Sequence, residues 1–131
     1  MIPKNLPESG VLVDYLKKDS TTNTSVVVSQ NAKDAKRAEL SYKIVNKKED
    51  IALIEVTLVT GRHHQIRVQM SHMGYPLLGD SKYSNDTSVT LTEKYQVKSI
   101  ALCAYQLQFK HPVTGKQLLY TIQPKGNIFV Q

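Results

Sequence analysis

The stretch IALIEVTLVTGRHHQIRVQM, residues 51–70, changes its structural period near the middle. Its first half, residues 51–59, alternates so that one face is apolar and the other is mixed, which predicts an antiparallel strand with one buried face. Residues 40–45 are also rich in β-forming side chains, and the polar run 46–50 lies between the two segments. We therefore expect a β-hairpin with a five-residue connection.

The second half of this stretch has the spacing of a helix. Ile66, Met70 and Met73 recur at intervals that place them on one helix face. Gly74 suits the C′ position that ends a helix, and a proline follows shortly after it. The pattern predicts a short helix over residues 63–73, directly after the strand.

The rest of the chain gives weaker signals. Residues 11–16 are expected to form an edge strand or a small helix, and further strands are expected at residues 26–28, 100–109 and 117–122. Residues 31–40 and 111–116 are polar and are expected to be turns or loops. Residues 81–98 are also polar and show no clear element.

These patterns predict an α+β fold, mostly an antiparallel sheet with one or two short helices. Residues 1–37 are expected to be a poorly ordered or linker-like segment, and residues 38–131 the main domain. The chain of 131 residues, 40% of them hydrophobic, is long enough for one core. It has neither an apolar run of membrane-spanning length nor a secretory signal.

The composition points to an anionic partner. There are 17 Lys and Arg residues against 11 Asp and Glu residues, a formal net charge of +6, so nucleic acid is the default partner. The alternative is that the charge only keeps the protein dissolved. The single cysteine, Cys103, excludes an intramolecular disulfide and fits a reducing, cytoplasmic location.

Two arginines flank the start of the expected helix. Arg62 precedes it and Arg67 lies in its first turns, where the free N–H groups of a helix also attract anions. Arginine can hold a phosphate or carboxylate through two hydrogen bonds, and Gln65 could read a base edge. The alternative interpretation is that these residues cap the helix and face solvent.

The histidines and the cysteine do not form a recognisable metal or nucleophile motif. His63, His64 and His72 lack the H-x-x-x-H spacing, and Cys103 and His111 are isolated in the sequence. A cysteine inside an apolar run is usually a small buried hydrophobe. We therefore expect no metal.

Three motifs resemble one known family. They are T-G-R-x-H-Q-I-R-V at residues 60–68, G-x-P-L-L-G-D-x-x-Y at 74–83, and L-x-A-x-x-L-x-F-x-H-P-x-T-G at 102–115. Together they resemble the C-terminal signature of the RluA-type RNA pseudouridine synthases, over roughly residues 38–125. His63, Gln69 and Cys103 depart from the family's usual Thr or Ser, His and His.

The resemblance implies isomerisation of uridine to pseudouridine in ribosomal or transfer RNA, without a cofactor. The family's nucleophile is an aspartate in an H-R-L-D segment, and the arginine that matches Arg67 pairs with it. Leu102 matches an apolar residue that lines the pocket. The resemblance makes Arg62, His64 and Gln65 signature residues that order the helix start or touch RNA.

The nucleophilic segment of the family is missing from this sequence. No H-R-L-D occurs, and Asp80 belongs to the G-D-x-x-Y turn, which is structural in the family. We therefore expect the C-terminal part of a catalytic domain, a partial fold that is inactive alone, with Arg67 lacking its carboxylate. A truncated sheet would expose an edge, so we expect self-association through it. The alternatives are a basic RNA-binding module without catalysis and a purely structural protein.

Overall fold

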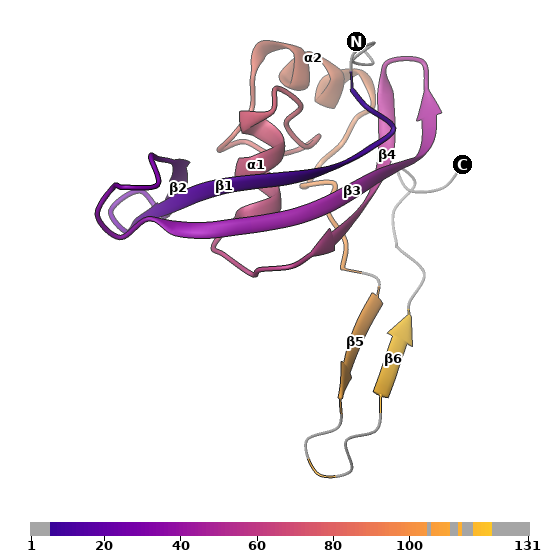
Figure 1. Cartoon of the computed structure of the whole chain (residues 1–131). Helices are drawn as coiled ribbons and strands as arrows, with labels where there is room; N and C mark the ends of the chain where they lie inside the picture. Colours follow the sequence, from indigo (N-terminus) through magenta and orange to yellow (C-terminus); the bar gives the residue numbers. More distant parts are fainter. Residues whose placement is uncertain (1–5, 105, 111–112, 114–116, 122–131) are drawn as a thin grey trace. The chain divides into compact units, whose positions relative to one another are not determined.

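The computed structural model describes residues 6–104, 106–110, 113 and 117–121. The chain divides into two compact units, residues 1–100 and 101–131. The first contains a four-stranded antiparallel sheet in the order β2-β1-β3-β4 (Figure 1). Its strands are β1 (Ser9–Asp19), β2 (Thr24–Val27), β3 (Lys36–Lys48) and β4 (Ile51–Leu58), and two helices follow, α1 (Gln65–His72) and α2 (Asp86–Lys94). The predicted α+β class is confirmed.

The predicted hairpin is formed by β3 and β4. Tyr42 pairs with Val56 and Ile44 with Ile54, so the core faces of the two strands coincide. The connection is tighter than predicted, because β3 continues to Lys48 and Glu49 turns the chain with a φ of 38°. A register shift after Ile44 interrupts the ladder, as a β-bulge does.

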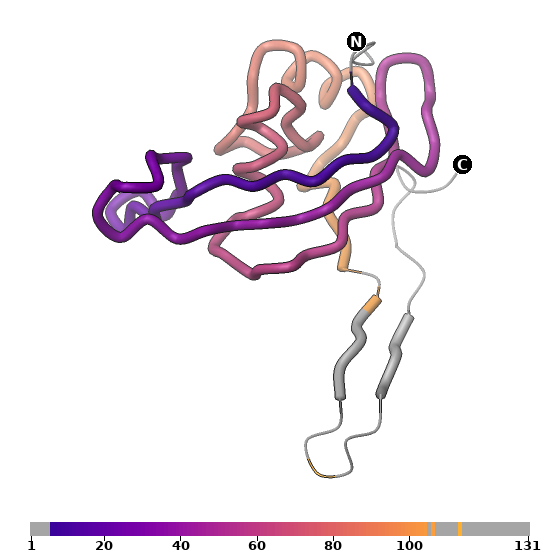
Figure 2. The backbone as a smooth tube through the Cα atoms, viewed as in Figure 1, coloured from indigo at the N-terminus to yellow at the C-terminus, as the bar shows by residue number. Residues whose placement is uncertain are grey.

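The N-terminal segment differs from the sequence expectation of a poorly ordered stretch up to residue 37. Residues 9–27 contain β1 and β2, and β1 is an interior strand. Figure 2 shows the backbone of β1 running beside that of β3 over most of its length. The expected boundary after residue 37 lies inside β3, and the expected loop at 31–40 overlaps the same strand. Strand β1 depends on a partner distant in sequence, which local propensity cannot detect.

The core lies on the sheet face that α1 covers. On β3 the buried side chains are every second residue, Ala38, Leu40 and Tyr42, as the pleat requires. Helix α1 contributes the buried side chains of Val68 and Met70. Leu40 and Tyr42 form one cluster with Leu6, and Ala38 and Val68 form a second with Leu16. Their partly buried neighbours include Ile54, Val56, Ile66, Met73, Tyr75, Val27 and Tyr83.

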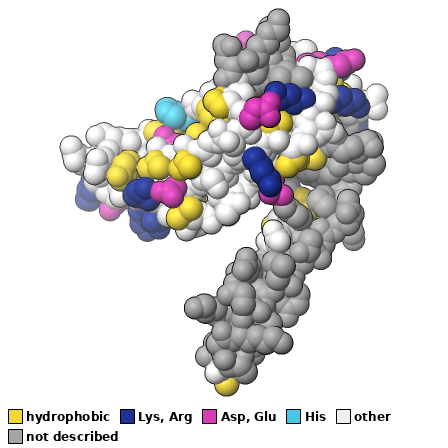
Figure 3. All heavy atoms as spheres, turned by 45° about the vertical axis from the view of Figure 1, so that its right-hand side comes forward, with side chains coloured by type: hydrophobic (Ala, Val, Ile, Leu, Met, Phe, Trp, Pro, Cys, Tyr) yellow, Lys and Arg dark blue, Asp and Glu magenta, His cyan; other side chains and the backbone are white. Residues whose placement is uncertain are grey.

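The opposite face of the sheet carries exposed valines. Val11 and Val13 on β1 alternate with the core-facing Leu12, and Val26 is exposed on β2. The space-filling view shows hydrophobic side chains at the surface, interspersed with charged ones (Figure 3). This mixture of exposed valines and charges is why the sequence of β1 shows only a weak strand pattern.

Helix α2 was not predicted, although its start has a local signal. The Asn85 side chain accepts a hydrogen bond from the Ser88 backbone N–H (2.8 Å), and the Ser88 hydroxyl accepts one from the Asn85 N–H (2.9 Å). This reciprocal pair is a capping box. Serine in place of the usual Glu or Gln at the third position hid it among the polar residues 81–98.

The second unit contains a hairpin of two strands, β5 (Gln106–Lys110) and β6 (Gln117–Thr121). They pair antiparallel, with Gln106 opposite Thr121, which confirms two of the predicted strands. Of the predicted turn at 111–116 only Val113 is among the described residues, and Ile122 lies outside them. Among the described residues, no helix is long and apolar enough to cross a membrane.

Candidate functional site

Helix α1 starts at Gln65 because the preceding residue, His64, has a left-handed backbone with a φ of 53°. The Gln65 side chain satisfies the groups around this start. Its Oε1 accepts hydrogen bonds from the Arg62 backbone N–H (2.9 Å) and the Thr60 hydroxyl (2.8 Å). Its Nε2 donates to the backbone carbonyl of Glu39 on β3 (3.0 Å). Gln65 is 3% exposed, so it anchors the helix start to the sheet.

At the other end, the helix stops where predicted. Gly74 has a φ of +102°, a conformation that glycine adopts without strain. Gly79 has a φ of +78°, and a Cβ at this position would collide with the carbonyl oxygen of Ser99. Its backbone N–H donates to the Thr92 hydroxyl of α2 (3.0 Å). Glycine is therefore required at position 79, and the residue after it, Asp80, is firmly placed.

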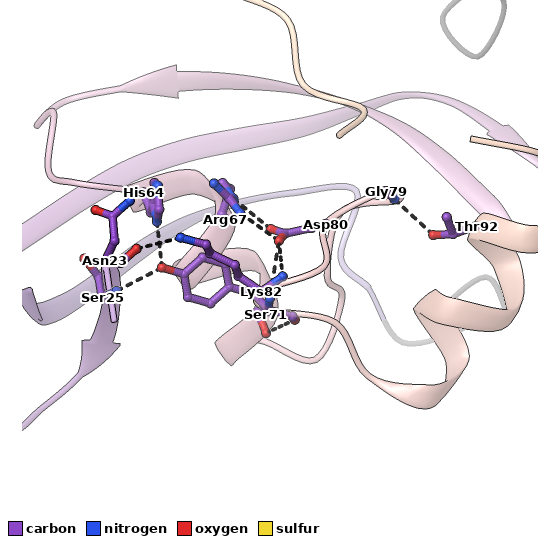
Figure 4. A network of polar contacts seen from close by, with 10 residues as sticks. Asn23, Ser25, His64, Arg67, Ser71, Gly79, Asp80, Lys82 and Thr92 are labelled. Atoms are coloured by element: carbon purple, nitrogen blue, oxygen red, sulfur yellow. Dashed lines mark hydrogen bonds and ion pairs between the residues drawn. The ribbon is translucent and has the colours of Figure 1, made fainter. Parts of the chain in front are cut away.

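Arg67 on α1 and Asp80 in the loop that follows it form an ion pair with two hydrogen bonds. Nε and Nη2 of Arg67 each donate to one oxygen of Asp80, both at 2.9 Å (Figure 4). The Asp80 side chain is fully buried, and Oδ1 also accepts from the backbone N–H groups of Lys82 (3.0 Å) and Tyr83 (3.3 Å). Burial alone raises the pKa of Asp80, but the Arg67 and backbone hydrogen bonds outweigh it and lower that pKa. The carboxylate is therefore ionised at neutral pH.

Tyr83 connects this ion pair to β2 and to the helix start. The guanidinium carbon of Arg67 lies 5.1 Å from the centre of the Tyr83 ring. The Tyr83 hydroxyl accepts a hydrogen bond from the Ser25 backbone N–H (2.9 Å) and lies 2.8 Å from Nδ1 of His64. The hydroxyl can donate its own proton to Nδ1 of His64, and in that arrangement the ring proton of neutral His64 lies on Nε2.

The two histidines stack at the same place. The ring centres of His63 and His64 lie 3.8 Å apart. Nδ1 of His63 is 2.9 Å from the Ser25 hydroxyl, and Nε2 is 3.2 Å from Oδ1 of Asn23. Burial lowers the pKa of both rings, and nearby positive charges lower it further, those of Lys18, Lys82 and Arg67 for His63 and those of Arg67, His63 and Lys82 for His64. Both histidines are therefore neutral at neutral pH.

A family model described as RNA pseudouridylate synthase matches residues 2–72, more than half of the chain. The chain belongs to this family. Among its relatives is the ribosomal large subunit pseudouridine synthase C of Vibrio cholerae, 33% identical over 96 residues, which are 73% of this chain and 30% of the relative. Synthase D of Zymomonas mobilis is 40% identical over 85 residues, 63% of this chain and 27% of the relative. The chain therefore spans less than a third of the length of these two pseudouridine synthases.

Solved structures show the same fold. Human RNA pseudouridylate synthase domain containing 1 matches with a TM-score of 0.71 at 18% identity, over 90% of this chain and 49% of that one. Human RNA pseudouridylate synthase domain containing 4 matches with a TM-score of 0.66 at 24% identity, over 95% of this chain and 54% of that one. The pseudouridylate synthase family match also begins far upstream of residue 38, so it includes β1 and β2.

The predicted site residues differ in their burial and in the groups they contact. Arg67 and His64 are joined through Tyr83, whereas Gln65 is buried and bonded at both ends of its amide. Arg62 is exposed, and its Nε donates to the backbone carbonyl of Arg37 (2.8 Å). Leu102 belongs to the second unit and is 41% exposed, so its pocket-lining role stays a prediction.

Arg67 has a carboxylate partner that was not predicted, because Asp80 pairs with it. That Arg67 lacks the family's nucleophilic aspartate stays a prediction. The D-x-x-Y spacing is the signal that could have revealed the pairing with Asp80, since it brings Asp80 and Tyr83 back to the helix together. In the described part of the chain, no group of three or more His, Cys, Asp or Glu side chains is arranged to hold a metal ion.

Proposed function

We propose that this chain is the C-terminal portion of the catalytic domain of an RNA pseudouridine synthase, and that alone it does not isomerise uridine. The observation that carries the proposal is the immobilised Arg67 on α1, within the family signature, in a sequence without an H-R-L-D segment. The share of the relatives that the chain spans, less than a third, supports a partial catalytic domain.

Asp80 is not a substitute nucleophile. Its side chain is fully buried, and its two oxygens together accept four hydrogen bonds from Arg67, Lys82 and Tyr83. A carboxylate that attacks a substrate needs access to it and a free lone pair. We assign Asp80 the task of holding Arg67 in one orientation.

Arg67 retains one edge for a second anion. Asp80 takes Nε and Nη2, and Nη1 makes no hydrogen bond to the described residues. A guanidinium held on one side can bind an incoming carboxylate without first losing rotational freedom. In this proposal Nη1 binds the nucleophilic aspartate of the missing segment and keeps it ionised by lowering its pKa.

The proposal extends to the partner and to the location. The substrate is ribosomal or transfer RNA, contacted by the exposed Arg62 and by His64, and Leu102 lines the uridine pocket of the complete domain. The resemblance to the family implies a reaction without a cofactor, and the proposal includes none. We place the protein in the cytoplasm, because both its proposed RNA substrates and a reduced Cys103 fit that compartment.

Tritium release from ribosomal RNA labelled at C5 of uridine tests the proposal. The chain alone should give no release above the blank, and turnover by the purified chain would contradict its inactivity. A polypeptide that supplies the H-R-L-D half of a relative should restore release. Arg67→Gln should abolish the restored release, whereas Arg37→Gln, a change at an exposed arginine on β3, should leave it.

A basic RNA-binding module without catalysis is the second candidate, favoured by the net charge of +6. Such a module would bind RNA alone, with an affinity that falls as salt rises, and would gain no activity from an added H-R-L-D half. Self-association through an edge of the sheet is a further proposal, since β2 and β4 are the outer strands. Light scattering that shows only monomer at high concentration would contradict it.

A further inference from the structure

The stacked histidines are the most unusual feature around α1. His63 stands where the family pattern has Thr or Ser, and its ring lies on that of His64 at an interplanar angle of 27°. A neutral stacked pair is stable, but the pair becomes self-repelling once both rings are charged. Such an arrangement therefore responds to any ligand that favours the charged form.

Cations lie near the pair on three of the segments around it. Lys18 comes from β1, Arg67 from α1, and Lys82 from the loop after α1. The groups on the β2 side, Asn23 and the Ser25 hydroxyl, are uncharged. Lys82 also donates to the backbone carbonyl of Asn23 (3.1 Å), which holds its ammonium group beside the rings.

The negative charge nearby is already engaged. Asp80 raises the pKa of His64, but its effect is the smallest of those on this ring. Both Asp80 oxygens accept hydrogen bonds from Arg67. His64 has one ring nitrogen bonded to Tyr83, and its Nε2 makes no hydrogen bond to the described residues. The site thus combines an available N–H donor with surplus positive charge, which is the chemistry that a phosphate group needs.

We propose that the His63–His64 pair, with Lys18 and Lys82, binds a backbone phosphate of RNA and takes up a proton from solution when it does so. This inference relies on the proposed function only for the identity of the ligand as RNA. The phosphate accepts from Nε2–H of His64. The added proton goes to a ring nitrogen of the pair, and the phosphate charge compensates for the repulsion that otherwise keeps the rings neutral.

Proton uptake predicts that RNA affinity rises as the pH falls. Fluorescence anisotropy with the whole chain and a labelled single-stranded RNA, at constant ionic strength, should show a Kd that falls about threefold to tenfold from about pH 7.5 to about pH 6. At the lower pH the salt dependence should steepen by about 0.7 in log–log slope, the value for one more phosphate contact on a single strand.

Variants locate the effect. His63→Thr introduces the residue usual in the family, and His64→Asn keeps a side chain that tolerates the left-handed backbone. In each variant the Kd for RNA should change less than about twofold over the same pH range, which is less than the uptake of one full proton would produce. His72→Gln, at an exposed histidine on the same helix, should retain it.

Resonances of the ring C–H groups in the unaltered chain provide a test that does not depend on variants folding. Saturating RNA should raise the titration midpoints of His63 and His64. RNA affinity independent of pH, midpoints that do not move, or no RNA binding at any pH would each overturn the inference. The tritium-release assay would still decide the proposed function separately.

Discussion

The carboxylate of Asp80 holds the guanidinium of Arg67 through two hydrogen bonds of 2.9 Å, one from Nε and one from Nη2. The carboxylate is completely buried, and the arginine side chain is 19% exposed. The pair therefore fixes the direction of Arg67 before any other anion arrives. It also joins α1 to the loop that follows it.

Removing the charge of Asp80 should destabilise the protein strongly. Asp80→Asn leaves the Arg67 charge largely buried without its partner, which costs about 3–5 kcal/mol of unfolding free energy. Urea denaturation followed by circular dichroism measures this change. The control is Glu8→Gln, which breaks the exposed pair with Lys47 and should move the midpoint little. Equal effects of the two variants would contradict the structural role of Asp80.

Removing the Tyr83 hydroxyl should also be costly. Tyr83→Phe leaves the Ser25 backbone N–H and Nδ1 of His64 without their partner, at a cost of about 1–3 kcal/mol of unfolding free energy. Tyr42→Phe is the matched control, because the Tyr42 hydroxyl makes no hydrogen bond to the described residues. Thermal melts of both variants should separate them, and a smaller loss for Tyr83→Phe would be inconsistent with this network.

Gln65 should matter for stability and not for RNA contact. Gln65→Ala removes the acceptor for the Arg62 N–H and the donor to the Glu39 carbonyl, a loss of about 1–3 kcal/mol of unfolding free energy. Asn85→Ala, which removes the cap of α2 at a cost of about 1 kcal/mol, is a destabilised control. Well below their melting temperatures both variants should bind RNA like the unaltered chain. A selective loss of affinity for Gln65→Ala would show direct contact.

A carboxylate at position 69 should produce a stability that depends on acid. The Nε2 of Gln69, 1% exposed, donates to Oδ2 of Asp14 at 2.9 Å, and its Oε1 is buried without a hydrogen bond. Gln69→Glu would place two carboxyl groups in this space, so one must be protonated. Denaturation midpoints should be much lower than those of the unaltered chain at pH 7 and recover partly toward about pH 5, near the ordinary range of carboxyl groups.

His63 and His64 should make the folded state sensitive to mild acid. Burial and the nearby cations lower their pKa values in the folded chain, whereas in the unfolded chain these return to about 6.5. Between the unfolded and folded values the unfolded chain binds more protons, so stability falls as the pH falls below about 6.5. Urea titrations from about pH 8 to pH 5 should show this slope.

The same titrations identify the groups responsible. His63→Thr and His64→Asn should flatten the slope between about pH 6.5 and pH 5, while Asp80, whose pKa is lowered, loses its contribution only below the usual aspartate value of about 3.9. If both histidine variants kept the full slope, the origin would lie in other groups.

The hairpin of β3 and β4 and the helix α1 follow from local patterns in residues 40–73. Alternation and helical spacing are properties of neighbouring residues, so a single sequence displays them, and the family signature at residues 60–83 lies in the same region. The capping box of Asn85 and Ser88 is equally local, and a closer inspection of residues 85–88 could have found it.

Strand β1 and the surroundings of Arg67 required the folded chain. Strand β1 is stable because β3 pairs along it, and Tyr83 reaches Ser25, 58 residues away in the sequence. The residues 60–83 establish the family and the position of Arg67 by themselves. That Asp80 neutralises Arg67, that Gln65 is buried and that His63 lies among cations depend on contacts made across the fold, where burial and charge act through space and leave no local pattern in the chain.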